Sequence, residues 1–468
     1  MLHLVRFFSN RKISRILAKR LGHYDVSSGE RRIEKVLKRY IGEKTDFDTT
    51  CRIYYPFVKN AIAYGAQRFD IDQEKMKEFF KDPIKRKGLG NVVLSISDYG
   101  VTKPQNLSAP FLVVWDITKA CNLKCRHCYS SSGTKSPNEL NTREVKKIID
   151  DLDRMGVVAL AFSGGEPLMR KDFFEIASYT ARKNIYVAVA SNGTLITESI
   201  AKKLKHAGVR YVEVSLDGIR PETHDRFRGV KGAWEKTVNG IKNCQGQGLM
   251  TAIATTATRS NYDEIENIID FAEKLGVDRF IEFNFIPTGR GRFAAAEDLT
   301  PEQREKMLRM LYRRSKTSNI EIFSTAPQYA RLAVESIINH TGEEISFTFY
   351  GGHMKGKTLE LAEFISGCGA GRLYCAISSS GKVRPCVFMP IVVGDLKKDR
   401  FSDIWKNAPV FRSLRTRKDA KGRCASCTYR YVCGGCRSRA YGYYGDIYEV
   451  DPGCIYNKEE FEKICEKE

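Results

Sequence analysis

The middle of the chain alternates short apolar runs with longer stretches whose apolar residues recur every three or four positions. The apolar runs predict buried strands, and the periodic stretches predict helices. Six strands are predicted, at residues 111–117, 157–162, 185–190, 211–216, 251–257 and 280–286. The helices predicted between them lie at residues 142–155, 171–183, 197–207, 233–247 and 262–275. This alternation indicates an α/β fold, with a parallel sheet and helices on its outside.

The first 105 residues follow a different pattern, which predicts a mostly helical extension. Helices are predicted at 33–40, 54–66 and 73–81, and a short strand at 91–97. Residues 1–20 hold six basic residues and no acid, with apolar residues partly at helical spacing. Two interpretations stay open: a basic amphipathic helix on an anionic membrane surface or a partner, or a helix docked on its own domain.

Just after the predicted strand at 111–117, the chain reads Cys-Asn-Leu-Lys-Cys-Arg-His-Cys, which places Cys121, Cys125 and Cys128 within eight residues. A cubane iron–sulfur cluster normally takes four cysteines. Three thiolates therefore leave one iron open for a ligand that is not protein. The alternative is a zinc loop, but zinc sites use paired CxxC or Cys/His spacings.

The CxxxCxxC spacing, with the aromatic His127 before the last cysteine, resembles the radical S-adenosylmethionine (SAM) superfamily. The resemblance implies a partial (β/α)6 TIM-like barrel and a [4Fe–4S] cluster held by the three cysteines. SAM would bind the open iron and be cleaved to a 5′-deoxyadenosyl radical. Sites in such barrels lie at the C-terminal ends of the strands.

The resemblance also assigns SAM contacts to residues at these strand ends. Gly164, Gly165, Glu166 and Pro167 match the segment that hydrogen-bonds the SAM amino group, with an ordinary glycine turn as the alternative. Ribose, methionine, carboxylate and adenine contacts would come from Ser191, Asn192, Ser215, Arg228 and Ile286. Capping a turn, or a solvated arginine, is the alternative for the polar residues among them. The run 288–291 is expected to contact anionic substrate groups.

Cysteines return near the C-terminus, at positions 368, 375, 386, 424, 427, 433, 436 and 454. The spacing resembles the SPASM extension, which carries auxiliary [4Fe–4S] clusters, but two residues instead of three separate Cys433 from Cys436. The resemblance implies one cluster on Cys368, Cys375, Cys386 and Cys436. It implies a second on Cys424, Cys427, Cys433 and Cys454. A zinc site on Cys424, Cys427, Cys433 and Cys436 is the alternative.

The composition of the chain indicates which partners and which cellular compartment to expect. The chain has 468 residues and a net charge of +21, which suggests an anionic partner or a solvated Lys/Arg-rich surface. No apolar run approaches a membrane span, and no signal peptide is recognised. Clustered thiolates favour metal binding in a reducing compartment, so we expect a cytoplasmic protein.

These observations predict four regions: a basic helical extension (1–105), a radical SAM barrel (106–318), a bridging region (319–363) and a SPASM domain (364–468). The predicted function is hydrogen abstraction from a peptide, protein or other large substrate, with electrons from a low-potential donor such as ferredoxin or flavodoxin. The run 433–441, ending at 451–454, resembles enzymes that act on tetrapyrrole carboxylates, so such a carboxylate-rich substrate is an alternative. A non-catalytic iron–sulfur electron-transfer protein is another, and nucleic acid is not an expected partner.

Overall fold

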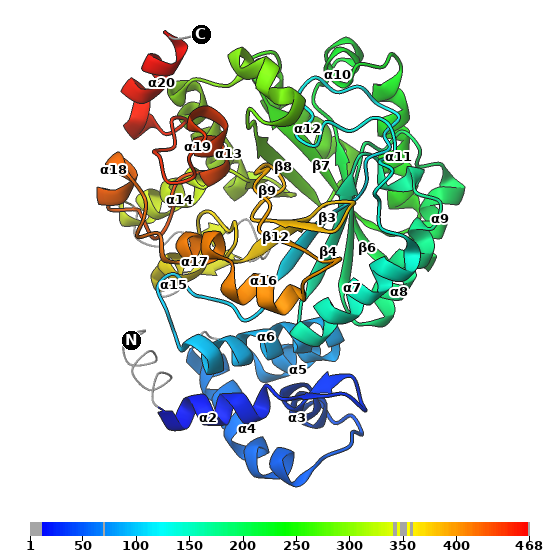
Figure 1. Cartoon of the computed structure of the whole chain (residues 1–468), viewed down its shortest axis with the longest axis vertical. Coiled ribbons are helices and arrows are strands. Elements are labelled where there is room, and N and C mark those ends of the chain that lie inside the picture. Colours follow the sequence, from blue (N-terminus) through cyan, green and yellow to red (C-terminus); the bar gives the residue numbers. More distant parts are fainter. Residues whose placement is uncertain (1–11, 69–70, 340–343, 347–352, 356–358, 467–468) are drawn as a thin grey trace.

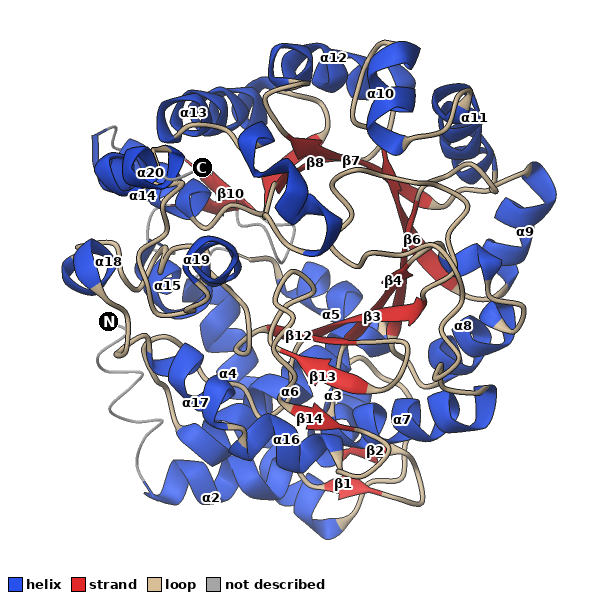
Figure 2. Ribbon diagram, turned by 45° about the horizontal axis from the view of Figure 1, so that its top comes forward, coloured by secondary structure: helices blue, strands red, loops and turns tan. Residues whose placement is uncertain are grey.

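A single mixed sheet forms the centre of the computed structural model, which describes residues 12–68, 71–339, 344–346, 353–355 and 359–466. Within these residues the sheet has ten strands, in the order β14-β13-β12-β3-β4-β5-β6-β7-β8-β9. Helices cover its outside (Figure 1), and loops fill the side toward which the sheet curves (Figure 2). No described helix is long and apolar enough to span a membrane.

Seven strands that follow one another along the chain run parallel. They are β3 (Leu112–Thr118), β4 (Ala159–Gly164), β5 (Tyr186–Ser191), β6 (Val209–Ser215), β7 (Met250–Ala257), β8 (Arg279–Asn284) and β9 (Glu321–Ser324). The helices that accompany them are α7 (Thr142–Met155), α8 (Phe173–Arg182), α9 (Glu198–His206), α10 (Pro221–Arg228), α11 (Ala233–Gly246), α12 (Ile265–Leu275), α13 (Pro301–Thr317) and α14 (Gln328–Asn339). The α/β barrel predicted from the sequence is therefore confirmed. The structure adds a seventh parallel strand, β9, which was not predicted because its four residues are too few to show a periodic pattern.

Helix α7 illustrates why these segments are helical. Asn141 and Glu144 form a capping box at its start, and Gly156 ends it in the left-handed conformation. The side chains that it buries recur at positions 145, 148, 149 and 152, which is one helical face. That face packs on the strands and forms part of the main core.

The cysteine-rich end of the chain continues the barrel sheet. Strand β12 (Tyr374–Ile377) pairs in parallel with β3, and β13 (Lys382–Arg384) and β14 (Gly394–Asp395) follow in antiparallel fashion. The other helices and strands after α14 are β10 (Glu344–Ser346), β11 (His353–Lys355), α15 (Leu359–Ile365), α16 (Phe401–Asn407), α17 (Pro409–Thr416), α18 (Gly422–Ser426), α19 (Arg437–Tyr444) and α20 (Lys458–Cys465). Because β12 joins β3, the C-terminal cysteines lie beside the strand that leads into the first cysteine loop.

The N-terminal elements form a helical layer below the sheet in the view of Figure 1. They are α2 (Lys12–Leu21), β1 (Tyr24–Asp25), β2 (Glu30–Arg31), α3 (Arg32–Tyr40), α4 (Thr49–Arg68), α5 (Gln73–Lys81) and α6 (Pro83–Tyr99). This layer has a small core of its own, centred on Ile33, Val36, Leu37 and Phe80. The expected helical extension is therefore present.

The predicted strand at 91–97 is wrong, because these residues belong to α6. Asp82 caps the helix, Pro83 occupies its first turn, and Gly100 ends it. Asn91 and Ser95, one turn apart, are buried and hydrogen-bonded to each other. The short apolar run at 92–94, with two β-branched valines, resembled a strand, but the buried polar pair faces a neighbouring part of the protein.

That neighbour is the barrel, onto which α6 is fastened by polar contacts. The Asn91 amide donates to the carbonyl oxygens of Ala109 and Gly156 at 3.1 and 3.0 Å. Lys87 forms a buried ion pair of 2.5 Å with Asp153. These contacts hold the helical layer against the end of α7.

Helix α2 in turn docks on α6. The Arg15 guanidinium donates to the carbonyl oxygens of Ser97 and Asp98 at 3.0 and 2.8 Å, where α6 ends. Cations near a helix C-terminus are stabilising. Residues 12–21 thus follow the docking interpretation. Residues 1–11 lie outside the described residues, so the membrane-surface interpretation stays a prediction.

Candidate active site

The first cysteine loop begins where β3 ends and is held by backbone contacts. The N–H of Cys121 donates to Gly133 O at 2.8 Å. From the other side, Arg290 donates from its backbone N–H to Cys128 O at 2.9 Å, and from its side chain to Cys125 O at 3.0 Å. Arg290 lies in the run expected to contact anionic substrate groups, yet its side chain is engaged with this loop.

The three thiols of this loop come together around one small apolar cluster. Cys121, Cys125 and Cys128 pack with Leu123 and Ala233. Burial raises the pKa of Cys121 to about 11. Burial also opposes ionisation of Cys128, but hydrogen bonds from Ser130 and the Ser132 N–H outweigh it and hold that pKa below its usual value.

His127 lies half-buried next to these thiols. Its ring stacks on that of Phe227, with centroids 4.1 Å apart and 25° between the planes. Burial lowers the pKa of His127 well below its usual value, and its Nδ1 has no hydrogen-bond partner. The residue is therefore a neutral aromatic ring that packs against the loop.

The glycine segment after β4 lies directly against the cysteine loop. Gly164 has a φ of 128°, and a Cβ on Gly165 would lie 2.0 Å from Ala120 O. The N–H groups of Gly165 and Glu166 donate to Thr118 O and Ala120 O at 2.8 and 2.7 Å. Only glycine allows this close approach of the two backbones.

Glu166 joins the ends of β4 and β5. Its buried carboxylate accepts from Ser191 Oγ at 2.9 Å, from the Asn192 N–H at 2.8 Å and from the Leu168 N–H at 3.2 Å. Burial raises the pKa of Glu166 to about 7, although these hydrogen bonds oppose the shift. Pro167, also buried, begins a short 3-10 helix. The Glu166 side chain therefore connects the ends of β4 and β5 by hydrogen bonds.

The other residues predicted to contact SAM at strand ends differ in their burial and in their hydrogen bonds. Ser191 and Asn192 are buried and bonded to neighbours, the Asn192 amide donating to Asn122 Oδ1 at 2.9 Å. Ser215, at the end of β6, is partly exposed. Ile286 follows β8 and is buried.

Arg228 lies beside the cysteine loop, where its charge is balanced by a residue that the prediction omitted. Its guanidinium Nε donates to Asp217 Oδ2 at 2.6 Å, and Nη1 lies 3.7 Å from Cys125 Sγ. Burial raises the pKa of Asp217, and Arg228 opposes that shift. Asp217 lies two residues after the end of β6, close to the position at which strand-end residues were sought.

The C-terminal cysteines form two groups. In the first group, Cys368 and Cys386 belong to the same small hydrophobic core as Tyr374, and the Tyr374 hydroxyl donates to Cys386 Sγ at 2.7 Å. Burial raises the pKa of Cys436, and the nearby Cys368 thiol contributes to the shift. Cys375, which the resemblance assigned to this set, is buried in the main core on the other side of the sheet.

The second group contains Cys424, Cys433 and Cys454. Burial raises the pKa of Cys454 to about 12, with Cys424 nearby, and Cys433 has both of these thiols as electrostatic neighbours. Cys427 ends α18, near Tyr429. Because Cys436 lies with Cys368, the structure does not gather the four cysteines of the alternative zinc site.

Polar residues that the sequence did not reveal lie between the barrel thiols and the first C-terminal group. Tyr129, next to Cys128, donates to Asp116 at 3.2 Å and lies 3.1 Å from Ser163 Oγ. Its ring meets Phe388 edge-on at 4.9 Å. Arg384 of β13 pairs with the same Asp116. No local spacing could indicate this set, since it joins β3, β4 and β13.

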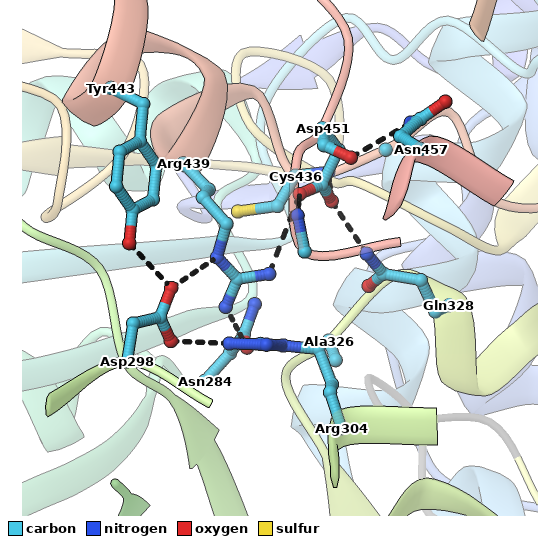
Figure 3. Close-up of polar contacts among 12 residues, drawn as sticks. Asn284, Asp298, Arg304, Ala326, Gln328, Cys436, Arg439, Tyr443, Asp451 and Asn457 are labelled. Carbon is cyan, nitrogen blue, oxygen red and sulfur yellow. Dashed lines mark hydrogen bonds and ion pairs between the residues drawn. The ribbon is translucent and has the colours of Figure 1, made fainter. Parts of the chain in front are cut away.

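Helix α19 carries a buried arginine that fixes the C-terminal region to the end of β8. Arg439 lies 3.4 Å from Asp451 and 3.5 Å from Asp298, and donates to Phe285 O at 3.0 Å. Asp451 accepts from the Cys436 N–H at 2.6 Å (Figure 3). The network therefore links the barrel directly to a cysteine of the first group.

One carboxyl faces the interior of the barrel. Glu213 lies in the middle of β6, between Ala190 of β5 and Ala252 of β7 in the sheet register. Burial raises its pKa to about 7, and a hydrogen bond with Tyr211 only partly opposes the shift.

A partial barrel with three thiols at the end of its first strand, joined to a region with two further thiol groups, defines an iron–sulfur enzyme. The chain belongs to the radical SAM superfamily, since the model described as "Radical SAM superfamily" matches residues 115–272 and one described as "Iron-sulfur cluster-binding domain" matches residues 368–428.

Proteins of known name support this membership. The chain is 40% identical to the AdoMet-dependent heme synthase of Methanosarcina barkeri over 75% of this chain and 97% of that protein. It is 33% identical to the mycofactocin maturase MftC of Mycolicibacterium smegmatis over 75% and 84%. Streptococcus suis SuiB bound to precursor peptide SuiA has a similar fold, with a TM-score of 0.62, 17% identity and coverage of 90% and 92%.

The cofactors of this family are a [4Fe–4S] cluster with SAM and auxiliary iron–sulfur clusters. The thiols of this chain fit these cofactors. The three barrel thiols pack around the same few apolar side chains, and the C-terminal thiols form two groups. No three His, Cys, Asp or Glu side chains in the described part of the chain lie close enough for a single metal ion. A cubane cluster binds each thiolate at a different iron and so does not require that closeness.

Proposed function

We propose that this radical SAM enzyme modifies the carboxylate side chains of a tetrapyrrole. The observation that carries the proposal is the similarity to the heme synthase, which extends over 97% of that protein. The run 433–441 and its continuation to Cys454 support the same substrate class. A polyanionic substrate also suits a chain of net charge +21.

In this proposal Cys121, Cys125 and Cys128 would hold the cluster that binds SAM, and these cofactors would supply a 5′-deoxyadenosyl radical. The residues predicted at strand ends would surround SAM. Glu166 would fix the ends of β4 and β5 through its three hydrogen bonds. Arg228 would place a positive charge beside the thiolate of Cys125, which favours its ionised form.

The junction between the barrel thiols and the first C-terminal group is the proposed substrate position. Arg384 and Lys119 bring two positive charges there against the one carboxylate of Asp116, with which Arg384 pairs, and a guanidinium can bind a carboxylate in bidentate fashion. Burial lowers the pKa of Lys119, which an incoming carboxylate would reverse. Tyr129 and Phe388 supply aromatic surface beside these charges.

The test uses anaerobically reconstituted protein with SAM, a chemical reductant and iron coproporphyrin III. We expect 5′-deoxyadenosine together with a change in porphyrin mass that corresponds to altered carboxylate side chains. The same porphyrin with its carboxylates esterified is the matched control and should not react. SAM cleavage with an unchanged porphyrin would refute the substrate assignment while leaving the radical chemistry intact.

A peptide or protein substrate, the first prediction from the sequence, is the second candidate. The similarity to the mycofactocin maturase favours it, at 33% identity over 84% of that protein. Its test is a short peptide encoded beside the gene, which should raise 5′-deoxyadenosine formation and change in mass. A low-potential donor such as flavodoxin or ferredoxin would serve either substrate.

A further inference from the structure

Two neighbouring residues of β12, Tyr374 and Cys375, face opposite sides of the sheet. Successive side chains in a strand point to opposite faces. Tyr374 packs with Cys368 and Cys386, whereas Cys375 is fully buried in the main core. On that side lies Arg415, whose guanidinium covers the ring of Trp405 at 4.3 Å.

We propose that the first auxiliary cluster is bound by three thiolates, those of Cys368, Cys386 and Cys436, and that Cys375 is not a ligand. The pairing of β12 with β3 fixes this orientation, because Cys375 lies opposite Val113, which is itself fully buried in the main core. A slip of one residue would be needed to turn Cys375 toward the other thiols. Such a slip moves every side chain of a strand to the other face.

That slip would bury the hydroxyl of Tyr374 in the apolar core and remove its contact with Cys386. The contact is short, 2.7 Å from Tyr374 Oη to Cys386 Sγ. An unpartnered buried hydroxyl costs about 1 to 3 kcal/mol, so the observed register is strongly favoured. The cluster is therefore left with an iron that no cysteine binds.

The carboxylate that contacts Cys436, that of Asp451, does not replace the missing thiolate. Asp451 accepts four hydrogen bonds, from the Cys436 and Gly453 N–H groups and from the Gln328 and Arg439 side chains. Both of its oxygens are occupied by these donors. Two hydroxyl groups lie against Cys386, those of Tyr374 and Ser438, and the Tyr374 hydroxyl donates a hydrogen bond to the sulfur. Hydrogen bonds to the sulfurs raise cluster potentials.

The experiment compares iron content and the EPR spectrum of the reduced protein in full-length variants, without SAM or substrate. Its outcome is therefore independent of the proposed substrate. Cys375→Val should keep the iron and the spectrum of the wild type, whereas Cys386→Ala should lose about four irons, one cubane cluster. Cys244→Ala is the matched control, a buried cysteine of α11 outside every thiol group. Equal iron loss in Cys375→Val and Cys386→Ala would overturn the proposal.

Two further variants guard against a simple folding defect. Cys375→Ser preserves the size of the side chain, and it should retain all iron even if its melting temperature falls. Tyr374→Phe should also retain the iron but give the auxiliary cluster a lower reduction potential, because the hydrogen bond to Cys386 is lost. Loss of a cluster in Cys375→Ser while the helical CD signal is unchanged, or an unaltered potential in Tyr374→Phe, would contradict the assignment.

Discussion

Replacing Arg439 by methionine should destabilise the attachment of the C-terminal region to the barrel. The side chain is fully buried between Asp298 and Asp451. Methionine fills a similar volume but carries no charge. Asp298 keeps an ion pair with Arg304, whereas Asp451 loses the cation that faces it.

The expected cost is about 3 kcal/mol. Breaking a buried ion pair by removing one partner costs about 3 to 5 kcal/mol. The lower end applies because Asp451 keeps three N–H donors and Asn284 Oδ1 keeps the donor from Arg304 at 3.1 Å. For a chain of 468 residues the unfolding entropy is about 1 kcal/mol per K, so such a loss lowers the melting temperature by about 3 °C.

Thermal unfolding and iron content of the reconstituted protein are the assays. Because Asp451 accepts from the Cys436 N–H, the C-terminal clusters should be lost before the barrel cluster on heating. Arg412→Met, at an exposed position of α17, is the control and should change stability by less than about 0.5 kcal/mol. Adding Asp451→Asn should recover part of the loss, since it removes the unpaired charge. Unchanged melting of Arg439→Met would refute the reasoning.

Four further predictions concern other parts of the molecule. Alanine at all three barrel cysteines should remove about four irons and abolish SAM cleavage, while iron bound by the C-terminal groups remains; unchanged cleavage would exclude the radical SAM mechanism. Gly165→Ala should prevent SAM cleavage, because its Cβ would lie 2.0 Å from Ala120 O; calorimetry should show weakened SAM binding. Burial holds the pKa of Glu213 at about 7 against an ordinary value of 4.5, so the folded state binds this proton more tightly and stability falls as pH rises between these values. Glu213→Gln should remove that loss, about 3 kcal/mol by pH 8, as urea unfolding at pH 5 and pH 8 can show, whereas the exposed Glu198→Gln should not. Neutralising Lys12, Lys19 and Arg20, and leaving the docking residue Arg15 in place, should weaken binding to anionic vesicles if this segment contacts a membrane surface, and salt should weaken wild-type binding in the same assay; vesicle binding that responds to neither change would leave only the docking role.

The sequence by itself determined the barrel and the barrel thiol site. Strand and helix periodicities depend on residues that are close along the chain, and all six predicted strands overlap β3 to β8. The three barrel cysteines lie within eight residues after a strand, so their convergence needs little tertiary information. The same is true of Gly165, whose position at a strand end places it against the cysteine loop.

Only the tertiary structure decided features that depend on which face of an element meets the core. Residues 91–97 form part of α6, where Asn91 finds buried carbonyl partners on the barrel, which the local sequence cannot reveal. The grouping of the C-terminal cysteines depends on β12 joining β3, a contact between residues more than 250 positions apart. That pairing turns Cys375 into the core and Tyr374 toward Cys386, because a strand alternates its faces and the sheet fixes which face is buried.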